Sequence, residues 1–279
     1  MKRILGIIAS PRRLGNCEIL VKEISRQVPE PHALDLIRLP EFRINTCKAC
    51  YTCLFAEMRC PQPDDLNTII EALVRADALI VAAPTYFLGA HSVLKRLLDR
   101  GLSFYGSADR IWGKPAVGVT VAGIEHREGY AKLNVDSFLK LILAEIKGSE
   151  IFFGALPGEV FLNEDNKQKA AGLGAALFGN SAWPGQPCCN LCGGDSFRFI
   201  GPGRVKCLLC GNPGSVTMED GKTVFQINSA DHEMVLSQEA ARVHLEWLRS
   251  MKDRFIQNRK ALKQITVQYL KDGTWIRPT

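Results

Sequence analysis

Residues 78–89, Ala-Leu-Ile-Val-Ala-Ala-Pro-Thr-Tyr-Phe-Leu-Gly, decide the fold. The first six of them form an uninterrupted apolar run, which is the pattern of a strand buried on both faces. A second run of this kind, Ile4 to Ala9, lies near the start of the chain. Parallel sheets that helices cover on both faces are built from such strands, so an α/β fold is expected.

Strand and helix patterns alternate around this run through the first 156 residues. We expect helices at 17–27, 66–75, 92–102 and 130–146, and further strands at 33–39, 115–122 and 150–156. The alternation predicts a doubly wound parallel sheet of five strands. Ligands bind such sheets outside the carboxyl ends of the strands, so the segments after the first, third and fourth strands form the candidate site.

The remainder of the chain is different in kind. A helix is expected at 163–178, and a Gly-, Pro- and Cys-rich stretch at 179–214 leads to a hairpin turn at Asp220-Gly221. A long amphipathic helix at 234–262 is expected to pack on the domain or on a second subunit. We expect residues 1–160 to form a domain that carries a cysteine-rich loop at 40–63. A helix and linker should follow at 161–185, a four-cysteine module at 186–230, and a C-terminal helix with a tail at 231–279.

Composition places the chain among globular proteins. Of its 279 residues, 46% are hydrophobic and 23% are charged, which excludes collagen-like, mucin-like and wholly disordered chains. The formal charge of +6 is mild and no stripe of Lys and Arg occurs, so a nucleic-acid partner is not expected. No apolar run approaches ~18 residues, and the run at 4–9 is too short for a signal peptide. We expect a cytoplasmic protein without a membrane span.

The turn after the first strand has the character of a phosphate-binding loop. Residues 9–17 read Ala-Ser-Pro-Arg-Arg-Leu-Gly-Asn-Cys and lead into a predicted helix. Free backbone N–H groups and the helix dipole favour an anion there, and Arg12 adds charge-assisted hydrogen bonds. The loop matches neither the GxGxxG fingerprint nor a P-loop, and an ordinary strand-to-helix turn with exposed arginines remains open.

This loop resembles the phosphate loop of the flavodoxin-like NADPH-dependent FMN reductases, which reads roughly Gly-Ser-x-Arg-x-x-Gly-Asn-Thr. The residues in register with that loop are Ser10, Arg12, Gly15 and Asn16, while Ala9 and Cys17 replace its first and last residues. The backbone N–H of Cys17 can still bind phosphate, although its side chain offers no hydroxyl. The resemblance covers about the first 155 residues and implies a flavodoxin-like fold that binds FMN.

A second match follows the third predicted strand. In the family the corresponding loop lies against the flavin ring, and the loop after the fourth strand completes the pocket. The resemblance therefore implies that FMN contacts Pro84, Thr85, Tyr86, Phe87, Leu88, Gly89, Ala122 and Gly123. An aromatic and apolar loop can stack on the isoalloxazine ring, while plain core packing is the alternative for Tyr86 and Phe87.

Eight of the ten cysteines form two groups, and their two-residue spacings indicate thiolate ligands in a reducing compartment. The first group comprises Cys47, Cys50, Cys53 and Cys60. Its CxxCxxC run is more typical of a [4Fe–4S] cluster than of zinc, which is the main competitor. In this loop the chain resembles a narrower family, the iron–sulfur flavoproteins.

The second group consists of two CxxCG knuckles separated by fourteen residues, and its members are Cys189, Cys192, Cys207 and Cys210. This spacing predicts a tetrahedral four-thiolate site in a zinc-ribbon or rubredoxin-like module. A structural zinc is favoured, because so small a module lacks a core of its own, and a mononuclear iron is the alternative. Cys188 lies beside the site and is expected to be spare.

These features together predict an FMN-dependent oxidoreductase with a [4Fe–4S] cluster and a zinc ribbon. The resemblance implies that it passes electrons between a ferredoxin-like carrier and a small acceptor, and that it forms a homodimer or homotetramer. No side chain is assigned as a general acid or base, and His126 could contact substrate or face solvent. One alternative is an NAD(P)H-dependent FMN or quinone reductase whose first cysteine loop is not redox-active. Another is a redox-sensing or electron-carrying adaptor that docks partners through the ribbon.

Overall fold

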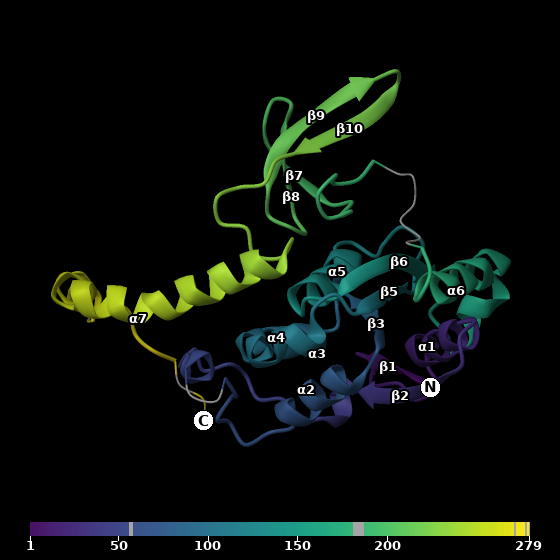
Figure 1. Cartoon of the computed structure of the whole chain (residues 1–279), viewed down its shortest axis with the longest axis horizontal. Helices are drawn as coiled ribbons and strands as arrows, with labels where there is room; N and C mark the ends of the chain where they lie inside the picture. Colours follow the sequence, from purple (N-terminus) through teal and green to yellow (C-terminus); the bar gives the residue numbers. More distant parts are fainter. Residues whose placement is uncertain (56–57, 181–186, 271, 277, 279) are drawn as a thin grey trace.

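The computed structural model describes residues 1–55, 58–180, 187–270, 272–276 and 278. Residues 56–57 of the expected cysteine-rich loop, 181–186 of the expected linker and module, and 271, 277 and 279 of the expected tail lie outside the described residues. Figure 1 shows an α/β body, a β-rich module and a helix that projects from both.

The body is built on a doubly wound sheet. Within the described residues its strands run parallel in the order β2-β1-β3-β5-β6, and the two-residue strand β4 pairs antiparallel with β3. This is the predicted α/β class with the flavodoxin-like strand order. The strands are β1 (Lys2–Ile8), β2 (His32–Arg38), β3 (Ala78–Tyr86), β4 (Gly89–Ala90), β5 (Pro115–Ala122) and β6 (Glu145–Phe153).

Helices cover both faces of the sheet because each central strand is apolar on both sides. Ile4 and Ile8 of β1 pack toward α1 and α6, whereas Leu5 and Ile7 pack toward α2, α3 and α5 (Figure 1). Lys114, before β5, donates to the last carbonyls of α2 and so caps that helix. The helices are α1 (Asn16–Arg26), α2 (Leu66–Arg75), α3 (Ser92–Leu98), α4 (Ala108–Ile111), α5 (Ala131–Leu141) and α6 (Glu164–Ala176).

Two predicted helix ends and one predicted strand in this body are wrong. The strand expected at 150–156 begins at Glu145 and ends at Phe153. The helix expected at 130–146 ends at Leu141, because Leu143 adopts a left-handed φ of 70° and Glu145 already pairs with Pro115 of β5. The helix expected at 92–102 ends at Leu98 and is followed by a 3-10 helix, Gly101–Ser107. In both places apolar residues at helical spacing continue past the point where the backbone turns.

The β-rich module forms an antiparallel sheet of its own. Its strands, in the described residues, follow the order β10-β9-β8-β7. The turn at Asp220-Gly221 joins β9 to β10, and both residues have positive φ, as the predicted hairpin requires. The strands are β7 (Phe197–Gly201), β8 (Arg204–Cys207), β9 (Pro213–Glu219) and β10 (Lys222–Ile227).

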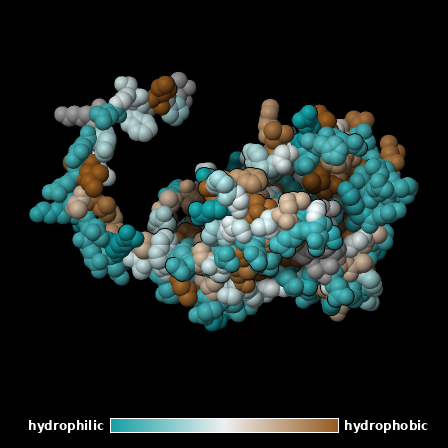
Figure 2. All heavy atoms as spheres, turned by 90° about the horizontal axis from the view of Figure 1, so that it is seen from above, coloured by the Kyte–Doolittle hydropathy of each residue, from teal (hydrophilic) through white to brown (hydrophobic). Residues whose placement is uncertain are grey.

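The last long helix, α7 (Gln238–Thr266), begins and ends four residues later than predicted. Ser237 caps it by accepting a hydrogen bond from the N–H of Ala240, 3.0 Å away. Its first half contacts the body, where Arg249 donates to the carbonyl of Leu54, but the rest projects away from it (Figures 1 and 2). Apolar side chains such as Phe255, Ile256 and Ile265 are exposed there. None of the helices in the described ranges combines the length and apolar character that a membrane crossing requires.

Candidate functional site

A cleft of about 210 Å³ lies at the carboxyl edge of the sheet. Nine of the thirteen residues predicted to bind a cofactor line it, namely Ser10, Arg12, Gly15, Asn16, Cys17, Pro84, Thr85, Tyr86 and Gly123. Phe87, Leu88, Gly89 and Ala122 are adjacent to these residues in the chain but are not part of the lining. The segment after β6, which we had not singled out, supplies Gly154, Ala155 and Pro157.

The turn between β1 and α1 forms one wall of this cleft. Gly15 is the N-cap of α1, and in the described residues no side chain caps this helix. A Cβ atom on Gly15 would lie 2.9 Å from the Cβ of Arg12, so the turn is too tight for a side chain. The uncapped first turn of α1 therefore offers its backbone N–H groups to an anion in the cleft.

Arg38, at the end of β2, braces this turn. Its guanidinium donates to the carbonyls of Ser10 and Arg12, at 3.3 and 2.8 Å, and to the carboxylate of Glu18 at 2.6 Å. The Glu18 carboxylate also accepts from the N–H of Leu14 at 2.6 Å. Arg38 and Glu18 together fix two carbonyls and one N–H group of this loop, so the turn is held from the side of β2.

The electrostatics of Glu18 follow from this brace. Burial would raise the pKa of Glu18, but hydrogen bonds from Lys22, Arg38 and Leu14 outweigh it and lower that pKa to about 2. The carboxylate is therefore ionised and keeps Arg38 in place. Sequence reasoning missed both residues, and the available signal was an acidic residue in the first turn of the predicted helix.

Two of the predicted ligands are engaged with the neighbouring loop. Asn16 donates from Nδ2 to the carbonyl of Gly154 at 2.8 Å and accepts at Oδ1 from the N–H of Gly158 at 2.9 Å. Arg12 donates to the carbonyl of Ala155 at 3.0 Å. The side chain of Asn16 thus fixes the segment after β6 against the turn, and Arg12 retains further N–H donors for a ligand.

Thr85 carries the clearest sign of a missing partner in the cleft. Its Oγ1 is buried, and no described residue forms a hydrogen bond with it. A buried hydroxyl without a partner is unfavourable by roughly 1–3 kcal/mol. A ligand with polar atoms along one edge, as in an isoalloxazine ring, would satisfy it, so the residues present fit FMN on this point.

The segment that follows Thr85 is held out into solvent. Phe87 and Leu88 both adopt left-handed φ values, 48° and 67°, and the Phe87 side chain is 100% exposed. This exposure contradicts core packing as the alternative for Phe87. The short strand β4 folds back on β3, and the N–H of Tyr130 donates to the carbonyl of Leu88 at 2.7 Å. The loop is thereby fixed as a rim over the cleft.

Cys17 contributes its backbone N–H group to the cleft and does not contribute a reactive thiol. Its side chain is buried beneath the first turn of α1, and burial raises its pKa to about 12. The thiol is therefore protonated near neutral pH and is unsuited to act as a nucleophile.

The second cysteine group converges on one point. Its four sulfurs lie within 4.8 Å of one another, with Cys189–Cys210 at 3.8 Å and Cys192–Cys207 at 3.6 Å. Four thiolates bound tetrahedrally to one ion at about 2.3 Å are separated by about 3.8 Å, so the donor set fits a single zinc or iron ion. Gly193 and Gly211 adopt positive φ in the two knuckles, as the sequence predicts.

The first cysteine group is more open. Cys47 and Cys50 are exposed, Cys53 and Cys60 are half-buried, and among the described residues the four sulfurs do not form a mutually close set like that of the ribbon. Each sulfur of a [4Fe–4S] cubane binds a different iron, so cubane ligands stand farther apart than the ligands of one ion. The four thiolates are the donor set that a [4Fe–4S] cluster requires, and they fit that group on this point.

Arg100 is the buried positive charge of this loop, with 2% of its surface exposed. It donates to the sulfur of Cys60 at 2.9 Å, to the carboxylate of Asp64 at 2.6 Å and to the carbonyl of Asn45 at 2.8 Å. Its Nε is buried, and no described residue accepts from it. A guanidinium beside sulfur stabilises the thiolate that a metal ligand must be. Sequence reasoning missed this role.

Comparison with known proteins identifies a family that the chain matches. A sequence model of the family described as NADPH-dependent FMN reductase matches residues 2–148. An iron-sulfur flavoprotein of Archaeoglobus fulgidus is 29% identical over 177 residues, covering 63% of this chain and 78% of that protein. An iron-sulfur flavoprotein of Methanocaldococcus jannaschii is 32% identical over 125 residues, covering 43% of this chain and 64% of the relative.

One solved structure matches the whole architecture. A flavone reductase superposes with a TM-score of 0.74 at 18% identity, covering 99% of this chain and 100% of that chain. The arrangement of sheet, ribbon and projecting helix therefore recurs as a unit in another protein.

Proposed function

The chain belongs to the NADPH-dependent FMN reductase family, and we propose that this FMN-dependent oxidoreductase passes electrons between a ferredoxin-like carrier and a small acceptor through a [4Fe–4S] cluster. One observation carries the proposal: the four-thiolate loop and the cleft follow neighbouring strands at the same edge of the sheet. Cys47 to Cys60 follow β2, and the cleft lies beyond β1, β3, β5 and β6.

The cleft residues divide into two sets for FMN. The first turn of α1, with Ser10 and Arg12, would hold the phosphate through backbone N–H groups and the Arg12 guanidinium. The Thr85 hydroxyl and the rim at 86–89 would hold the ring, with Ala122 and Gly123 near its opposite side. Bound FMN exchanges electrons singly or in pairs, which suits it to connect a one-electron carrier with a two-electron acceptor.

The cysteine groups receive different metals in this proposal. Cys47, Cys50, Cys53 and Cys60 would hold the [4Fe–4S] cluster, a choice supported by the CxxCxxC spacing and the names of the relatives. The converged ribbon group would hold a structural zinc, since its cysteines pack into the same apolar cluster as α5. Mononuclear iron remains the alternative for the ribbon.

For the acceptor we propose a small, flat aromatic compound. Tyr86 lines the cleft and Phe87 stands exposed beside it, so an aromatic molecule entering over the rim meets rings on which it can stack. The flavone reductase with the same architecture acts, by its name, on a compound of this class.

Cellular context and assembly extend the proposal. The ten cysteines are free thiols in the structure, which suits a reducing cytoplasm. The exposed apolar residues on the distal half of α7 suit a homodimer or homotetramer. Sedimentation equilibrium of the holoprotein tests the second point, and a monomer at all concentrations would contradict it.

Metal and flavin analysis of anaerobically purified protein tests the function. We expect about one FMN, about four iron and about one zinc per chain, with an EPR signal of a reduced cubane on addition of dithionite. Cys60→Ser should lose the iron and its EPR signal while keeping zinc, and Cys188→Ser, outside both groups, should keep all three. Flavin without iron in the wild type would contradict the proposal.

The choice of electron donor separates this function from its nearest alternative. Rapid flavin reduction by reduced ferredoxin, lost in Cys60→Ser, is the expected result. Equally rapid reduction by NADPH in wild type and Cys60→Ser would instead favour an NAD(P)H-dependent FMN or quinone reductase. If a variant without the ribbon still turns over substrate, the ribbon is not needed for catalysis, and a role in docking partners is favoured.

A further inference from the structure

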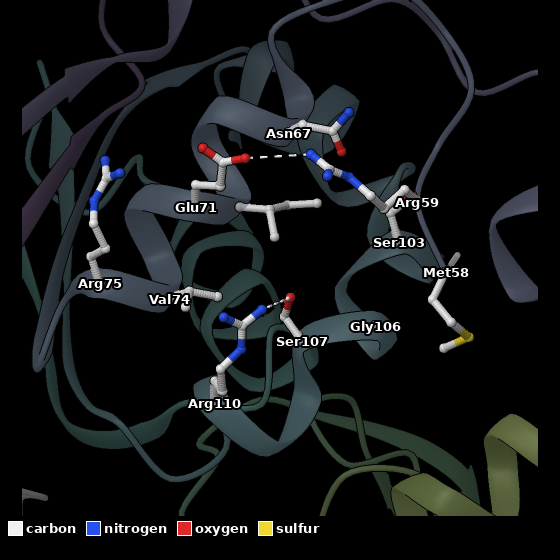
Figure 3. A pocket seen from close by; sticks show the side chains of 11 residues that line it. Met58, Arg59, Asn67, Glu71, Val74, Arg75, Ser103, Gly106, Ser107 and Arg110 are labelled. Atoms are coloured by element: carbon white, nitrogen blue, oxygen red, sulfur yellow. Dashed lines mark hydrogen bonds and ion pairs between the residues drawn. The ribbon is translucent and has the colours of Figure 1, made fainter. Parts of the chain in front are cut away.

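A second cavity, distinct from the cleft, lies beside the first cysteine loop (Figure 3). It has a volume of about 380 Å³ and is formed by α2, the 3-10 helix Gly101–Ser107, α4 and the residues just before Cys60. We call it the arginine pocket, after Arg59, Arg75 and Arg110 in its lining.

The charge of the arginine pocket is strongly positive. Three guanidinium groups line it, whereas Glu71 is the carboxylate among its described lining residues. Arg59 pairs with Glu71 at 3.3 Å, with both side chains more than half exposed, and Arg110 donates to the hydroxyl of Ser107 at 3.4 Å (Figure 3). Exposed ion pairs and hydrogen bonds of this kind contribute little to stability, so the arginine side chains can leave these partners and bind an incoming anion.

Ser103 connects the arginine pocket with the first cysteine group. The residue is 3% exposed and lines the cavity, and its hydroxyl hydrogen-bonds the sulfur of Cys53. One wall of the pocket therefore contacts a cysteine that we propose as a cluster ligand.

The back of the pocket is the cysteine loop itself. Met58 and Arg59 immediately precede Cys60, and a Cβ atom on Gly106 would lie 2.7 Å from the backbone oxygen of Met58. The short helix Thr52–Leu54, which carries Cys53, packs against the 3-10 helix that carries Ser103. A molecule seated in the pocket therefore lies beside the segments that carry Cys53 and Cys60.

We propose that the arginine pocket is the docking surface for an acidic one-electron carrier protein, whose carboxylates enter between Arg59, Arg75 and Arg110. This inference rests on the proposed function and locates the entry of its electrons. In each encounter the reduced carrier gives up one electron and the cluster accepts one, with no bond made or broken and no proton moved.

The lining favours carboxylates of a protein over a nucleotide. None of the described lining residues is aromatic, so an adenine ring would have no stacking surface in the pocket. The arginines come from three separate segments and remain exposed at the mouth, which suits a broad acidic surface. Opposite charges of this kind steer encounters and make the association rate dependent on salt.

The test compares two triple variants of the holoprotein with the same change in charge. One removes the arginine pocket, Arg59→Gln with Arg75→Gln and Arg110→Gln. The control removes three exposed arginines elsewhere, Arg26→Gln with Arg204→Gln and Arg259→Gln. Cluster reduction by a reduced acidic ferredoxin is followed by stopped-flow absorbance at several salt concentrations, and reduction by dithionite is followed in parallel.

We expect the pocket variant to be reduced by ferredoxin about tenfold or more slowly, with most of the salt dependence gone. Reduction by dithionite, iron content and the EPR signal should match the wild type, and the control should behave as the wild type throughout. Equal ferredoxin rates in the two triple variants would overturn the docking surface. Slower flavin reduction by NADPH in the pocket variant alone would overturn it in favour of a nucleotide-phosphate site.

Binding of oxidised ferredoxin, measured by calorimetry, keeps this inference separable from the cluster itself. The dissociation constant should rise about tenfold or more in the pocket variant and stay unchanged in the control. If the protein lacks iron but the pocket variant still binds ferredoxin more weakly than the control, the proposed function is contradicted and the docking surface is supported. If the protein holds the cluster but both variants bind ferredoxin equally well, the proposed function is supported and the docking surface is contradicted.

Discussion

In the ribbon, four sulfurs lie within 4.8 Å of one another, and the buried ones belong to an apolar cluster. At the sheet edge, Cys47 to Cys60 lie on an open loop, and Arg100, buried against Asp64, holds this loop in place. The phosphate loop at the same edge is held in a similar way by Arg38 and Glu18. In our proposal the ribbon depends on its metal for its structure, whereas the sheet edge is held by arginine–carboxylate pairs.

The comparison teaches that cysteine spacing alone does not define the role of a site. A module of this size buries little apolar surface within itself, so we expect the free energy of metal binding to supply much of its folding free energy. The cysteine loop instead borrows the stability of a large α/β body. It can leave its sulfurs accessible to a cluster and to a redox partner.

The largest expected effect is that of Cys207→Ser in the ribbon. Loss of one ligand should release the zinc and unfold β7–β10, since metal binding contributes on the order of 10 kcal/mol to such modules. Metal analysis and hydrogen exchange of the ribbon amides measure it, with Cys188→Ser as the matched control. Ribbon amides that stay protected from exchange after zinc loss would contradict the proposed dependence of the ribbon on its metal.

Arg100→Gln should have the next largest effect. It leaves the Asp64 carboxylate buried without its partner, which should lower the free energy of unfolding by about 3–5 kcal/mol. Urea unfolding at pH 7 measures this, and Arg96→Gln, which changes an exposed arginine on the preceding helix α3, is the control. Equal urea midpoints for the two variants would contradict a stabilising role of the Arg100–Asp64 pair.

The pH dependence of this pair has a defined sign. Burial would raise the pKa of Asp64, but hydrogen bonds from Arg100 and from backbone N–H groups outweigh it and lower that pKa. A carboxyl whose pKa is lower in the folded state stabilises the fold above its unfolded pKa and loses that stabilisation as the pH falls through the folded value. The difference between wild type and Arg100→Gln should therefore shrink in acid.

Glu18→Gln should weaken the other brace by a smaller amount. Loss of the charged hydrogen bonds to Arg38 and Leu14 should lower the free energy of unfolding by about 2 kcal/mol and weaken FMN binding. The wild type should lose this increment between about pH 4.5 and about pH 2, whereas the variant should not. Flavin fluorescence titration and pH-dependent unfolding measure both effects. Glu23→Gln on the same helix should change neither.

Cys53→Ser should have the smallest effect on stability, under about 1 kcal/mol, because its loop is held by Arg100 and not by metal. Iron should be lost while FMN and zinc remain, as shown by metal analysis and thermal unfolding. Unfolding as severe as that of Cys207→Ser would remove the distinction between the two cysteine groups.

The sequence predicted much of the fold because its apolar runs are long and uninterrupted. Strand β5 and helix α2 have the predicted limits, since each is bounded by residues that change the pattern. The start of β6 was wrong because Leu141 to Ala144 continue a helical pattern while the backbone reverses at Leu143. Hydrogen bonding to β5, a long-range interaction, overrides local periodicity there.

Within the candidate site, the sequence by itself determined which residues can serve as ligands, because cysteine spacing and the loop at 9–17 are local patterns. It did not reveal the roles of Arg38, Glu18 and Arg100, because Arg38 and Glu18 are 20 residues apart along the chain and Arg100 and Cys60 are 40 residues apart. The tertiary structure decided which sulfurs converge, which arginines are buried as braces, and which gather in a pocket beside Cys60. Convergence, burial and charge are set by segments that meet only when the sheet has formed.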